Sequence, residues 1–384
     1  MKILIRLAKK CRDLITMCKL FFCVVIFKVF NHKKTCLMFS NGMGYGGAPL
    51  VLVEAAKYYK NKGYKVIIYS EHYGKLINIC HKLNISVWIN PHKNEMINNM
   101  ILDCKYEIVF VNTAPMYKWV EAFETKKQKI IWWLHEGDTY INQLADSLPK
   151  DVNDNVKVLV VSPRTIEALA KNKIQYSTDM LFYGVEDLVS EGYNVQSVYK
   201  DKTTFLIMGA ICERKNQIEV IAAYDKLSDD VKGKSDFIFV GEPLDENDEY
   251  FTSFLSMVEE RKQLKYIPKV ERAKINDLYN EIDSLICSSK DDPLPVVVTE
   301  CFMFGKIAVV SSEAGQFALI EDDINGFVYN VNDIDCLCKK ITAVVQKKDC
   351  NKMKELSRKT YERYFMKKSF FEELERFTNE ILRR

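Results

Sequence analysis

The sequence is poor in histidine and lacks the spacings by which proteins hold metals. It has five histidines in 384 residues, and no histidine or cysteine cluster is spaced like a metal site. Its twelve cysteines are scattered and include no Cys-x-x-Cys pair, which predicts reduced thiols of the cytosol and not a disulfide scaffold. We therefore expect a protein that needs neither a metal ion nor a cofactor.

The sequence also lacks an apolar run long enough to cross a membrane. Near the N-terminus the longest uncharged run, 20–27, has eight residues, whereas a spanning helix needs about 20. Lys19 and Lys28 interrupt the apolar stretch 14–30, and no small-residue cleavage site follows it. We therefore expect neither a spanning helix nor a cleaved signal peptide.

Residues 1–34 carry most of the positive charge of the chain. The segment has one acidic residue, Asp13, and nine basic residues: Lys2, Arg6, Lys9, Lys10, Arg12, Lys19, Lys28, Lys33 and Lys34. The segment thus carries +8 and the whole chain +3, so the remainder is acidic, which argues against a nucleic-acid-binding protein. We predict a basic, apolar helix lying on the inner face of the cell membrane. A helix packed on the protein body, or a short, poorly inserted span, remains an alternative.

The rest of the chain has the pattern of two α/β domains. Its length and its 48% hydrophobic content suit two cores. Apolar strands alternate with amphipathic helices, which predicts parallel sheets. We expect one Rossmann-like domain over 35–185, a linker over 186–202, a second such domain over 203–364 and a closing helix over 365–384. Strands are expected at 35–40, 64–70, 85–89, 107–111, 129–133, 156–161, 180–182, 204–208, 236–240, 265–267, 283–287 and 307–310.

Two acids, Asp292 and Glu300, form the most informative motif. They lie eight residues apart, after the predicted strand 283–287 and around a helix that we expect over 295–304. Pro295 suits the first turn of that helix, whose free backbone N–H groups and positive dipole end would face the loop holding Asp292. Such an end binds phosphate. The plainer interpretation is an ordinary strand–loop–helix with two unrelated acids.

Three other positions follow predicted strands. Arg214 and Lys215 lie at the start of a helix, a position unfavourable for cations, which indicates an anion nearby. His135 follows the strand 129–133, where it can hydrogen-bond a sugar hydroxyl in either charge state. The loop 42–47 matches G-x-G-x-x-G, and Glu71 ends the next strand, as in a dinucleotide-binding fold.

Together these motifs resemble the retaining glycosyltransferases of family 4, the glycosyl transferases group 1. The resemblance covers about 38–345 and rests on five segments: Asp292-x7-Glu300, Gly46 to Val66, His135 at its strand end, Gly209 to Lys215, and Leu181 to Glu186. The chain departs from the family at Asp292, where Glu is commoner, and at Ala210, where the family usually has Arg. Gly315 and the turn 321–327 also resemble the family, although Ala318 stands where Glu is frequent.

The resemblance implies a GT-B fold, two Rossmann-like domains facing across a cleft, and metal-independent transfer from a nucleotide sugar. It implies catalytic roles for Asp292, His135 and Lys215, with Asp292 contacting the donor sugar. Donor binding would involve Glu300 at the ribose, positive groups at the diphosphate, and backbone of both domains. These donor-binding residues are Glu300, Arg214, Lys215, Leu294, Pro295, Val296, Gly46 and Gly47.

The implied partners are a UDP- or GDP-sugar, a glycan or lipid-linked acceptor for a surface polysaccharide or glycolipid, and the cytoplasmic membrane surface. Two other functions stay open. A nicotinamide-dependent oxidoreductase would use the loop 42–47 and Glu71. A non-catalytic carbohydrate-binding relative is favoured by Ala210.

Overall fold

The chain folds into two compact units. The computed structural model describes residues 2–30, 34–189, 201–271, 274–347 and 350–384. Unit 1 comprises Met1–Val161, Thr165–Leu181 and Phe371–Arg384, and unit 2 comprises Ser162–Arg164 and Phe182–Phe370. Most of the predicted linker, 186–202, lies outside the described residues.

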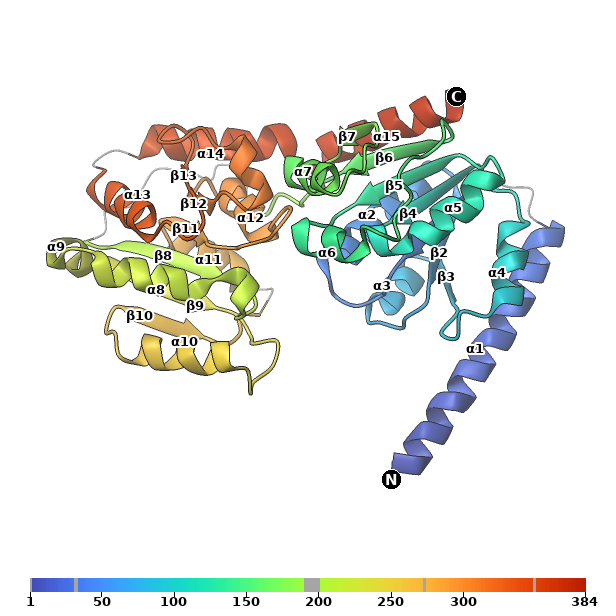
Figure 1. The fold of residues 1–384 in the computed structure, drawn as a ribbon, viewed down its shortest axis with the longest axis horizontal. Helices are drawn as coiled ribbons and strands as arrows, with labels where there is room; N and C mark the ends of the chain where they lie inside the picture. The colour runs from blue at the N-terminus through green and yellow to red at the C-terminus, as the bar shows by residue number, and fades with distance from the viewer. Residues whose placement is uncertain (1, 31–33, 190–200, 272–273, 348–349) are drawn as a thin grey trace. The chain divides into compact units, whose positions relative to one another are not determined.

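Unit 1 contains a parallel sheet of seven strands in the order β3-β2-β1-β4-β5-β6-β7 (Figure 1). Its central strands are continuous runs of buried residues, as expected of a sheet covered on both faces. The strands are β1 (Thr35–Ser40), β2 (Lys65–Ser70), β3 (Ser86–Ile89), β4 (Ile108–Asn112), β5 (Ile130–Leu134), β6 (Val156–Val160) and β7 (Thr178–Met180). The helices are α1 (Lys2–Phe30), α2 (Gly47–Asn61), α3 (Leu76–Lys82), α4 (Glu95–Leu102), η1 (Ala114–Met116), α5 (Tyr117–Thr125), α6 (Asp138–Leu144) and the greater parts of α7 (Pro163–Lys171) and α15 (Lys367–Arg383).

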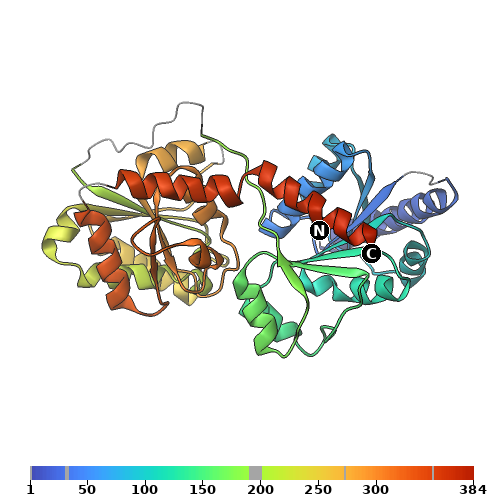
Figure 2. The ribbon, with the colours of Figure 1, turned by 90° about the horizontal axis from the view of Figure 1, so that it is seen from above.

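Unit 2 repeats the plan with six parallel strands in the order β10-β9-β8-β11-β12-β13. Helices cover both faces of each sheet, as the view from above shows (Figure 2). The strands are β8 (Thr203–Met208), β9 (Ser235–Val240), β10 (Leu264–Ile267), β11 (Ser284–Cys287), β12 (Ile307–Ser311) and β13 (Phe327–Tyr329). The helices are η2 (Glu213–Lys215), α8 (Gln217–Lys226), α9 (Asp229–Gly233), α10 (Glu249–Glu259), α11 (Ile275–Glu281), α12 (Val296–Met303), η4 (Gly315–Leu319), α13 (Ile334–Gln346) and α14 (Asn351–Tyr364).

Each sheet has one place where the direction of strand addition reverses. In unit 1 the chain adds β2 and β3 on one side of β1 and then β4 on the other. In unit 2 it adds β9 and β10 on one side of β8 and then β11 on the other. The loops at the carboxyl ends of the two strands that flank such a point leave in opposite directions and open a crevice for ligands. The folds therefore point to the ends of β1 and β4, and of β8 and β11.

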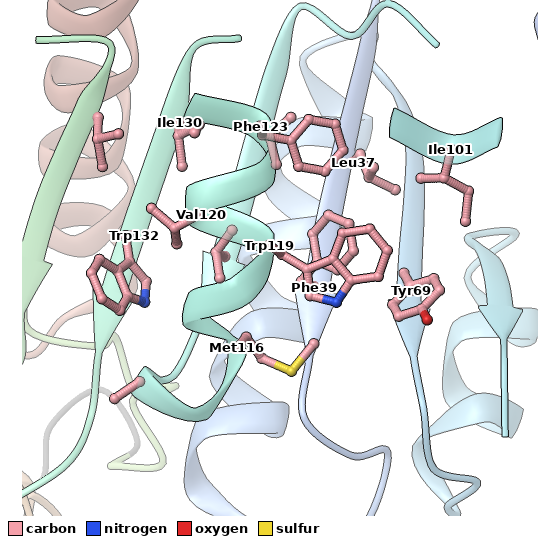
Figure 3. Packing of buried hydrophobic residues seen from close by; sticks show 14 of the residues in the cluster. Leu37, Phe39, Tyr69, Ile101, Met116, Trp119, Val120, Phe123, Ile130 and Trp132 are labelled. Carbon is pink, nitrogen blue, oxygen red and sulfur yellow. The ribbon is translucent and has the colours of Figure 1, made fainter. Parts of the chain in front are cut away.

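The core of unit 1 is aromatic and lies between α5 and the sheet (Figure 3). Trp119 and Phe123, four residues apart on one face of α5, are directed at Phe39 of β1. The ring centroids of Phe39 and Trp119 are 4.4 Å apart. Each such side chain contributes about 1.5–3 kcal/mol when fully buried, so this layer holds helix and sheet together.

Helix α1 is partly built into this core. Leu20, Val24 and Phe27 lie on one face of the helix and are at most 3% exposed. Phe27 stacks on Tyr106 with centroids 5.5 Å apart and meets the edge of Trp88. The alternative of a helix packed on the body thus describes one face of α1. Among the described helices, none is both long and apolar enough to cross a membrane.

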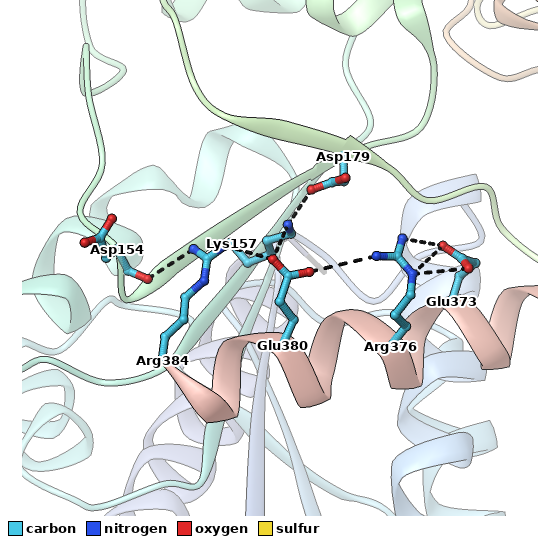
Figure 4. Close-up of polar contacts among 7 residues, drawn as sticks. All are labelled: Asp154, Lys157, Asp179, Glu373, Arg376, Glu380 and Arg384. Carbon is cyan, nitrogen blue, oxygen red and sulfur yellow. Dashed lines mark hydrogen bonds and ion pairs between the residues drawn. The ribbon is translucent and has the colours of Figure 1, made fainter.

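Helix α15 completes unit 1 with residues far away in the sequence. Its side chains Leu374 and Phe377 are fully buried. On the polar side, Lys157 of β6 is nearly buried and forms ion pairs with Asp179 and with Glu380, the latter at 2.9 Å (Figure 4). The last turns of α15 are therefore tied to the edge of the sheet by apolar packing and by charge.

The predicted fold class, an α/β protein with two Rossmann-like parallel sheets, is confirmed. Two strand predictions are wrong. The strand expected at 180–182 lies at 178–180, and β13 at 327–329 is missing from the prediction. Both strands have three residues, too few for the buried apolar run that marks the longer ones.

Candidate active site

Three predicted charged residues meet in unit 2, at the carboxyl ends of β8 and β11. Lys215, at the end of η2, forms an ion pair through Nζ with Oδ2 of Asp292. Nη1 of Arg214 lies 3.8 Å from the same carboxylate oxygen and donates to the carbonyl of Asp291 at 2.7 Å. The side chains of Lys215 and Asp292 are only 16% and 14% exposed. The sequence predicted an anion near Arg214 and Lys215. In the protein without a ligand, that anion is the carboxylate of Asp292.

Backbone contacts hold the two loops in this arrangement. Oγ of Ser288 donates to the carbonyl of Lys215 at 2.9 Å, and the N–H of Lys290 donates to the carbonyl of Arg214 at 2.8 Å. Gly209, directly after β8, has φ +154°, which side-chain-bearing residues rarely adopt. The position of the charges is therefore determined by backbone geometry at the strand ends.

Asp292 is fixed from its other side by Gly315. The N–H of Gly315 donates to the carbonyl of Asp292 at 2.9 Å, and the N–H of Asp292 donates to that of Glu313 at 3.1 Å. A Cβ atom at position 315 would lie 1.6 Å from the carbonyl oxygen of Pro293. Only glycine allows this close approach.

The turn that precedes α12 is anchored by two side chains that the sequence analysis does not identify. Tyr183 donates from its hydroxyl to the carbonyl of Leu294 at 2.8 Å. Gln316 donates from Nε2 to the carbonyl of Pro295 at 2.8 Å. Pro295 is the N-cap and Val296 the first residue of α12, so the helix begins one residue later than predicted. These bonds hold the start of α12 at the loop of Asp292.

Glu300 lies inside α12 and is 2% exposed. Its Oε2 accepts a hydrogen bond from the hydroxyl of Tyr279 at 3.2 Å. The carboxylates of Asp292 and Glu300 both raise the pKa of Tyr183, which burial raises most. The two acids thus share one neighbour. Tyr279 has no sequence signal of its own, because its partner follows 21 residues later along the chain.

His135 lies in unit 1, directly after β5. Its Nε2 is 2.9 Å from Oδ1 of Asn112, the last residue of β4, and its ring packs on Trp133. Burial lowers the pKa of His135 to about 3, so the ring is neutral at physiological pH. The expectation that this histidine can take either charge state is therefore wrong, because the sequence does not show how deeply the strand end is buried.

Glu136, which the sequence analysis does not assign, supports the same strand end. It is 8% exposed, and its Oε2 accepts from the backbone N–H groups of Ala114 at 3.0 Å and His135 at 2.9 Å. The residue before Ala114, Thr113, has φ +86°. Burial raises the pKa of Glu136 to about 7, although these N–H groups act in the opposite direction.

The glycine loop leads into α2. Gly46 is the N-cap and Gly47 the first helical residue, and the carbonyl of Ala48 accepts from Nδ2 of Asn112 at 3.1 Å. Glu71, the acid of the nicotinamide alternative, forms an ion pair with Lys93 at 2.7 Å. The predicted residues thus form two groups, positions 46, 47 and 135 in unit 1 and positions 214, 215, 292, 294–296 and 300 in unit 2.

Within the described ranges, no group of three or more histidine, cysteine, aspartate or glutamate side chains is placed to hold a metal ion.

Two family models match the sequence. A model described as glycosyl-transferase family 4 matches residues 32–181, and one described as glycosyl transferases group 1 matches residues 192–363. Both descriptions name the family that the motifs resemble. No curated protein sequence matches the chain significantly.

Solved glycosyltransferase structures share the fold. HepE from Anabaena, solved with UDP, is 16% identical over 90% of this chain and 100% of its own, with a TM-score of 0.74. A glycosyltransferase from Rickettsia africae is 18% identical over 92% and 99%, with a TM-score of 0.72. The lipopolysaccharide outer core galactosyltransferase WaaB is 13% identical over 89% and 98%, with a TM-score of 0.71. These likenesses support the two-unit fold.

The buried Glu136 predicts a pH-dependent stability of unit 1. Its pKa is about 7 in the folded chain and about 4.3 in an unfolded one. A raised pKa means that the folded state holds the proton of Glu136 more tightly than the unfolded state does. The resulting contribution to the free energy of unfolding is complete below pH ~4 and is lost as pH rises through 7. We expect the free energy of unfolding of the wild type to fall relative to Glu136→Gln over this window, by up to about 1.4 kcal/mol per pH unit.

Tryptophan fluorescence during urea unfolding measures this difference, because Trp88, Trp119, Trp132 and Trp133 all lie in unit 1. The amide of Gln keeps an oxygen that can accept from the two N–H groups. Parallel stability curves for the two proteins between pH 4 and 7 would contradict the raised pKa.

Proposed function

The chain belongs to the group 1 glycosyltransferases, and we propose that it transfers a sugar, with retention of configuration, from a UDP-sugar to a lipid-linked glycan acceptor. The predicted enzyme class, a glycosyltransferase that uses a nucleotide sugar, is confirmed by the family. The family models favour the transferase over the oxidoreductase alternative, because both describe glycosyltransferases. The observation that carries the proposal is the meeting of Lys215, Asp292 and the start of α12 in unit 2.

The diphosphate of the donor would bind at this meeting point. Lys215 and Arg214 supply positive charge, and the first turn of α12 supplies backbone N–H groups at its positive end. In the protein alone Asp292 neutralises Lys215, so a phosphate that arrives competes with a carboxylate that is already in place. During transfer negative charge develops on the leaving diphosphate, and cations held in advance stabilise it. Arg214 would take the place of the arginine that the family usually has where this chain has Ala210.

Glu300 would bind the ribose of the donor. A carboxylate accepts from two neighbouring hydroxyls, and Tyr279 already orients one of its oxygens. The buried position of Glu300 strengthens such charge-assisted bonds, because water competes less for the carboxylate. The fold likeness to HepE, which has been solved with UDP and with UDP-glucose, supports UDP as the nucleotide.

Asp292 would contact hydroxyls of the donor sugar, and His135 would accept a hydrogen bond from a sugar hydroxyl. The carboxylate of Asp292 accepts, and it changes partner from Lys215 to a hydroxyl when a phosphate occupies the lysine. Gly46 and Gly47 would let the backbone at the start of α2 approach the ligand, since neither position carries a side chain and a Cβ at Gly47 would meet nothing within 4 Å.

The membrane surface is proposed as the place of reaction, on the evidence of α1. The face of α1 opposite the core is apolar and exposed, with Phe22 63% and Ile26 58% exposed. The other exposed apolar side chains of this helix are Leu7, Leu14, Ile15, Val29 and Phe30. Exposed basic residues accompany them: Arg6, Lys9, Lys10, Arg12, Lys19 and Lys28. Apolar area flanked by cations fits an anionic lipid surface.

An apolar groove continues this surface between α1 and α4. It has a volume of about 390 Å³ and is lined by side chains of both helices: Leu14, Met17, Cys18, Phe21, Phe22, Asn94, Met96 and Ile97. Because the opposite face of α1 is packed in the core of unit 1, α1 would present the whole unit to the membrane. An acceptor carried by a lipid would then reach the enzyme at the cytoplasmic face of the membrane.

We first expect Glu300→Gln to weaken binding of UDP. An amide keeps the shape but loses the charge, and hydrogen bonds to charged groups contribute about 1.5–3 kcal/mol, so the Kd should rise roughly tenfold to a hundredfold. Calorimetric titration of both proteins with UDP measures the change. Glu281→Gln, at the exposed last residue of α11, is the matched control and should leave the Kd unchanged. An unaltered Kd for Glu300→Gln would remove this residue from the site.

Lys215→Met should lower turnover more than it lowers donor binding. Methionine keeps the apolar stem, whereas the charge that stabilises the leaving group is lost, which typically costs about 10²–10³ in kcat. Release of UDP from a UDP-sugar reports the rate. Lys226→Met, at the far end of α8, serves as control, and Arg214→Gln should approach the loss seen for Lys215→Met. Full activity of the Arg214 variant would contradict the proposal that Arg214 replaces the family's arginine at the position of Ala210.

Membrane binding should depend on the exposed face of α1. The double change Phe22→Glu and Ile26→Glu removes two side chains that each contribute about 1.5–3 kcal/mol when buried in lipid, so flotation with anionic vesicles should fall tenfold or more. Leu244→Glu, which alters a 77% exposed leucine of unit 2, is the control. Binding of the wild type should weaken with salt. Equal flotation of the double variant would place the membrane contact elsewhere.

A further inference from the structure

A chain of hydrogen bonds in unit 1 joins the start of α2 to His135 through Asn112. Nδ2 of Asn112 donates to the carbonyl of Ala48 at 3.1 Å, and Oδ1 of Asn112 lies 2.9 Å from Nε2 of His135. We propose that Asn112 is a positioning residue that holds His135 in one tautomer, with the hydrogen on Nε2 and a bare nitrogen at Nδ1. The inference deepens the proposed function and rests on it only for the role of His135 toward a ligand.

The direction of each bond follows from what the groups can do. A backbone carbonyl only accepts, so the amide of Asn112 must turn its NH₂ group toward Ala48. Its oxygen then faces the ring, and an amide oxygen also only accepts. Nε2 of His135 must therefore carry the hydrogen. Rotating the amide by a half-turn would set its oxygen against the carbonyl oxygen of Ala48, and two acceptors repel one another.

Burial makes this orientation costly to change. Asn112 is 0% exposed and ends β4, where it pairs in register with Ser40 of β1 and Trp133 of β5. Its backbone is thus held by strands on both sides. A buried amide or carbonyl left without a partner costs about 1–3 kcal/mol, which opposes any other arrangement of the amide.

The second ring nitrogen becomes an obligate acceptor. No hydrogen bond to Nδ1 of His135 is found among the described residues, and burial keeps the ring neutral by lowering its pKa. A neutral nitrogen without a hydrogen can accept from a hydroxyl but cannot donate to a phosphate or carboxylate oxygen. Asn112 therefore assigns His135 to a sugar hydroxyl and excludes it from binding the leaving diphosphate.

The same bonds connect His135 with the glycine loop. Ala48 follows Gly47 in the first turn of α2, so the carbonyl that orients Asn112 belongs to the segment that would approach the ligand. A displacement of that turn would break the bond between Asn112 and Ala48. The amide of Asn112 could then rotate, and His135 would no longer be held in one tautomer. Recognition of a hydroxyl is thereby made conditional on the position of the loop.

The test is ¹⁵N NMR of the full-length, ligand-free protein labelled on histidine. The two ring nitrogens differ strongly in shift according to which one carries the hydrogen, and His135→Gln identifies the signal among the five histidines. We expect only the Nε2–H tautomer of His135 at neutral pH. A hydrogen on Nδ1 in the wild type would overturn the proposal, whether or not the enzyme turns over a UDP-sugar.

Two variants of Asn112 separate positioning from a structural role. Asn112→Asp keeps an acceptor toward His135 but cannot donate to Ala48, so the Nε2–H tautomer should persist. Asn112→Leu removes the acceptor, so the Nδ1–H form should appear, and kcat/KM for a UDP-sugar should fall tenfold or more below that of Asn112→Asp. Asn155→Ala, which deletes another amide bonded to a backbone carbonyl, controls for general loss of stability. Equal tautomers in the Asp and Leu variants would contradict the role of the acceptor, and if the Leu variant does not fold, the wild-type spectrum decides.

Discussion

The reversal of strand order inside each parallel sheet is the constraint on which the candidate site depends. At β1 and β4, and again at β8 and β11, neighbouring strands send their loops in opposite directions, and no backbone crosses the gap between them. Asn112 ends β4, and the loops of Lys215 and Asp292 follow β8 and β11. Within each unit, side chains far apart in the sequence thus meet at the carboxyl edge of the sheet.

Electrostatics differs between the two groups of candidate residues. Unit 2 gathers charge, with Lys215 and Asp292 paired and only slightly exposed, so that a ligand exchanges partners with groups already desolvated. In unit 1 burial disfavours charge, because it lowers the pKa of His135 to about 3 and raises that of Glu136 to about 7. The charged group in unit 2 suits the proposed leaving diphosphate, and the neutral ring of His135 suits the proposed contact with a sugar hydroxyl.

The sequence was sufficient for the fold class and for the residues with local signals. Asp292 stands directly before Pro293, Lys215 follows Gly209 by six residues, and Glu300 follows Asp292 by eight, and those patterns predict a loop and a helix after a strand. Asn112, Tyr279 and Gln316 carry no such signal, because each acts through a partner that only the tertiary fold brings near. Burial is equally hidden in a single sequence, and for that reason the charge state of His135 was predicted wrongly.

The two faces of α1 show how one helix can satisfy opposite demands. Its pattern of apolar residues suggested a choice between the protein body and a membrane. The structure divides the helix lengthwise: Leu20, Val24 and Phe27 belong to the core, while Phe22 and Ile26 are exposed. Apolar residues all around a helix are therefore consistent with a body contact on one side and a lipid contact on the other.

Helix α15 has a consequence for the order in which the protein is made. Residues 371–384 belong to unit 1, where Leu374, Phe377 and Ile381 are fully buried, yet they are synthesised after all of unit 2. Domains usually fold in the order of their synthesis. Here the apolar surface of unit 1 that α15 covers stays open until unit 2 has been synthesised.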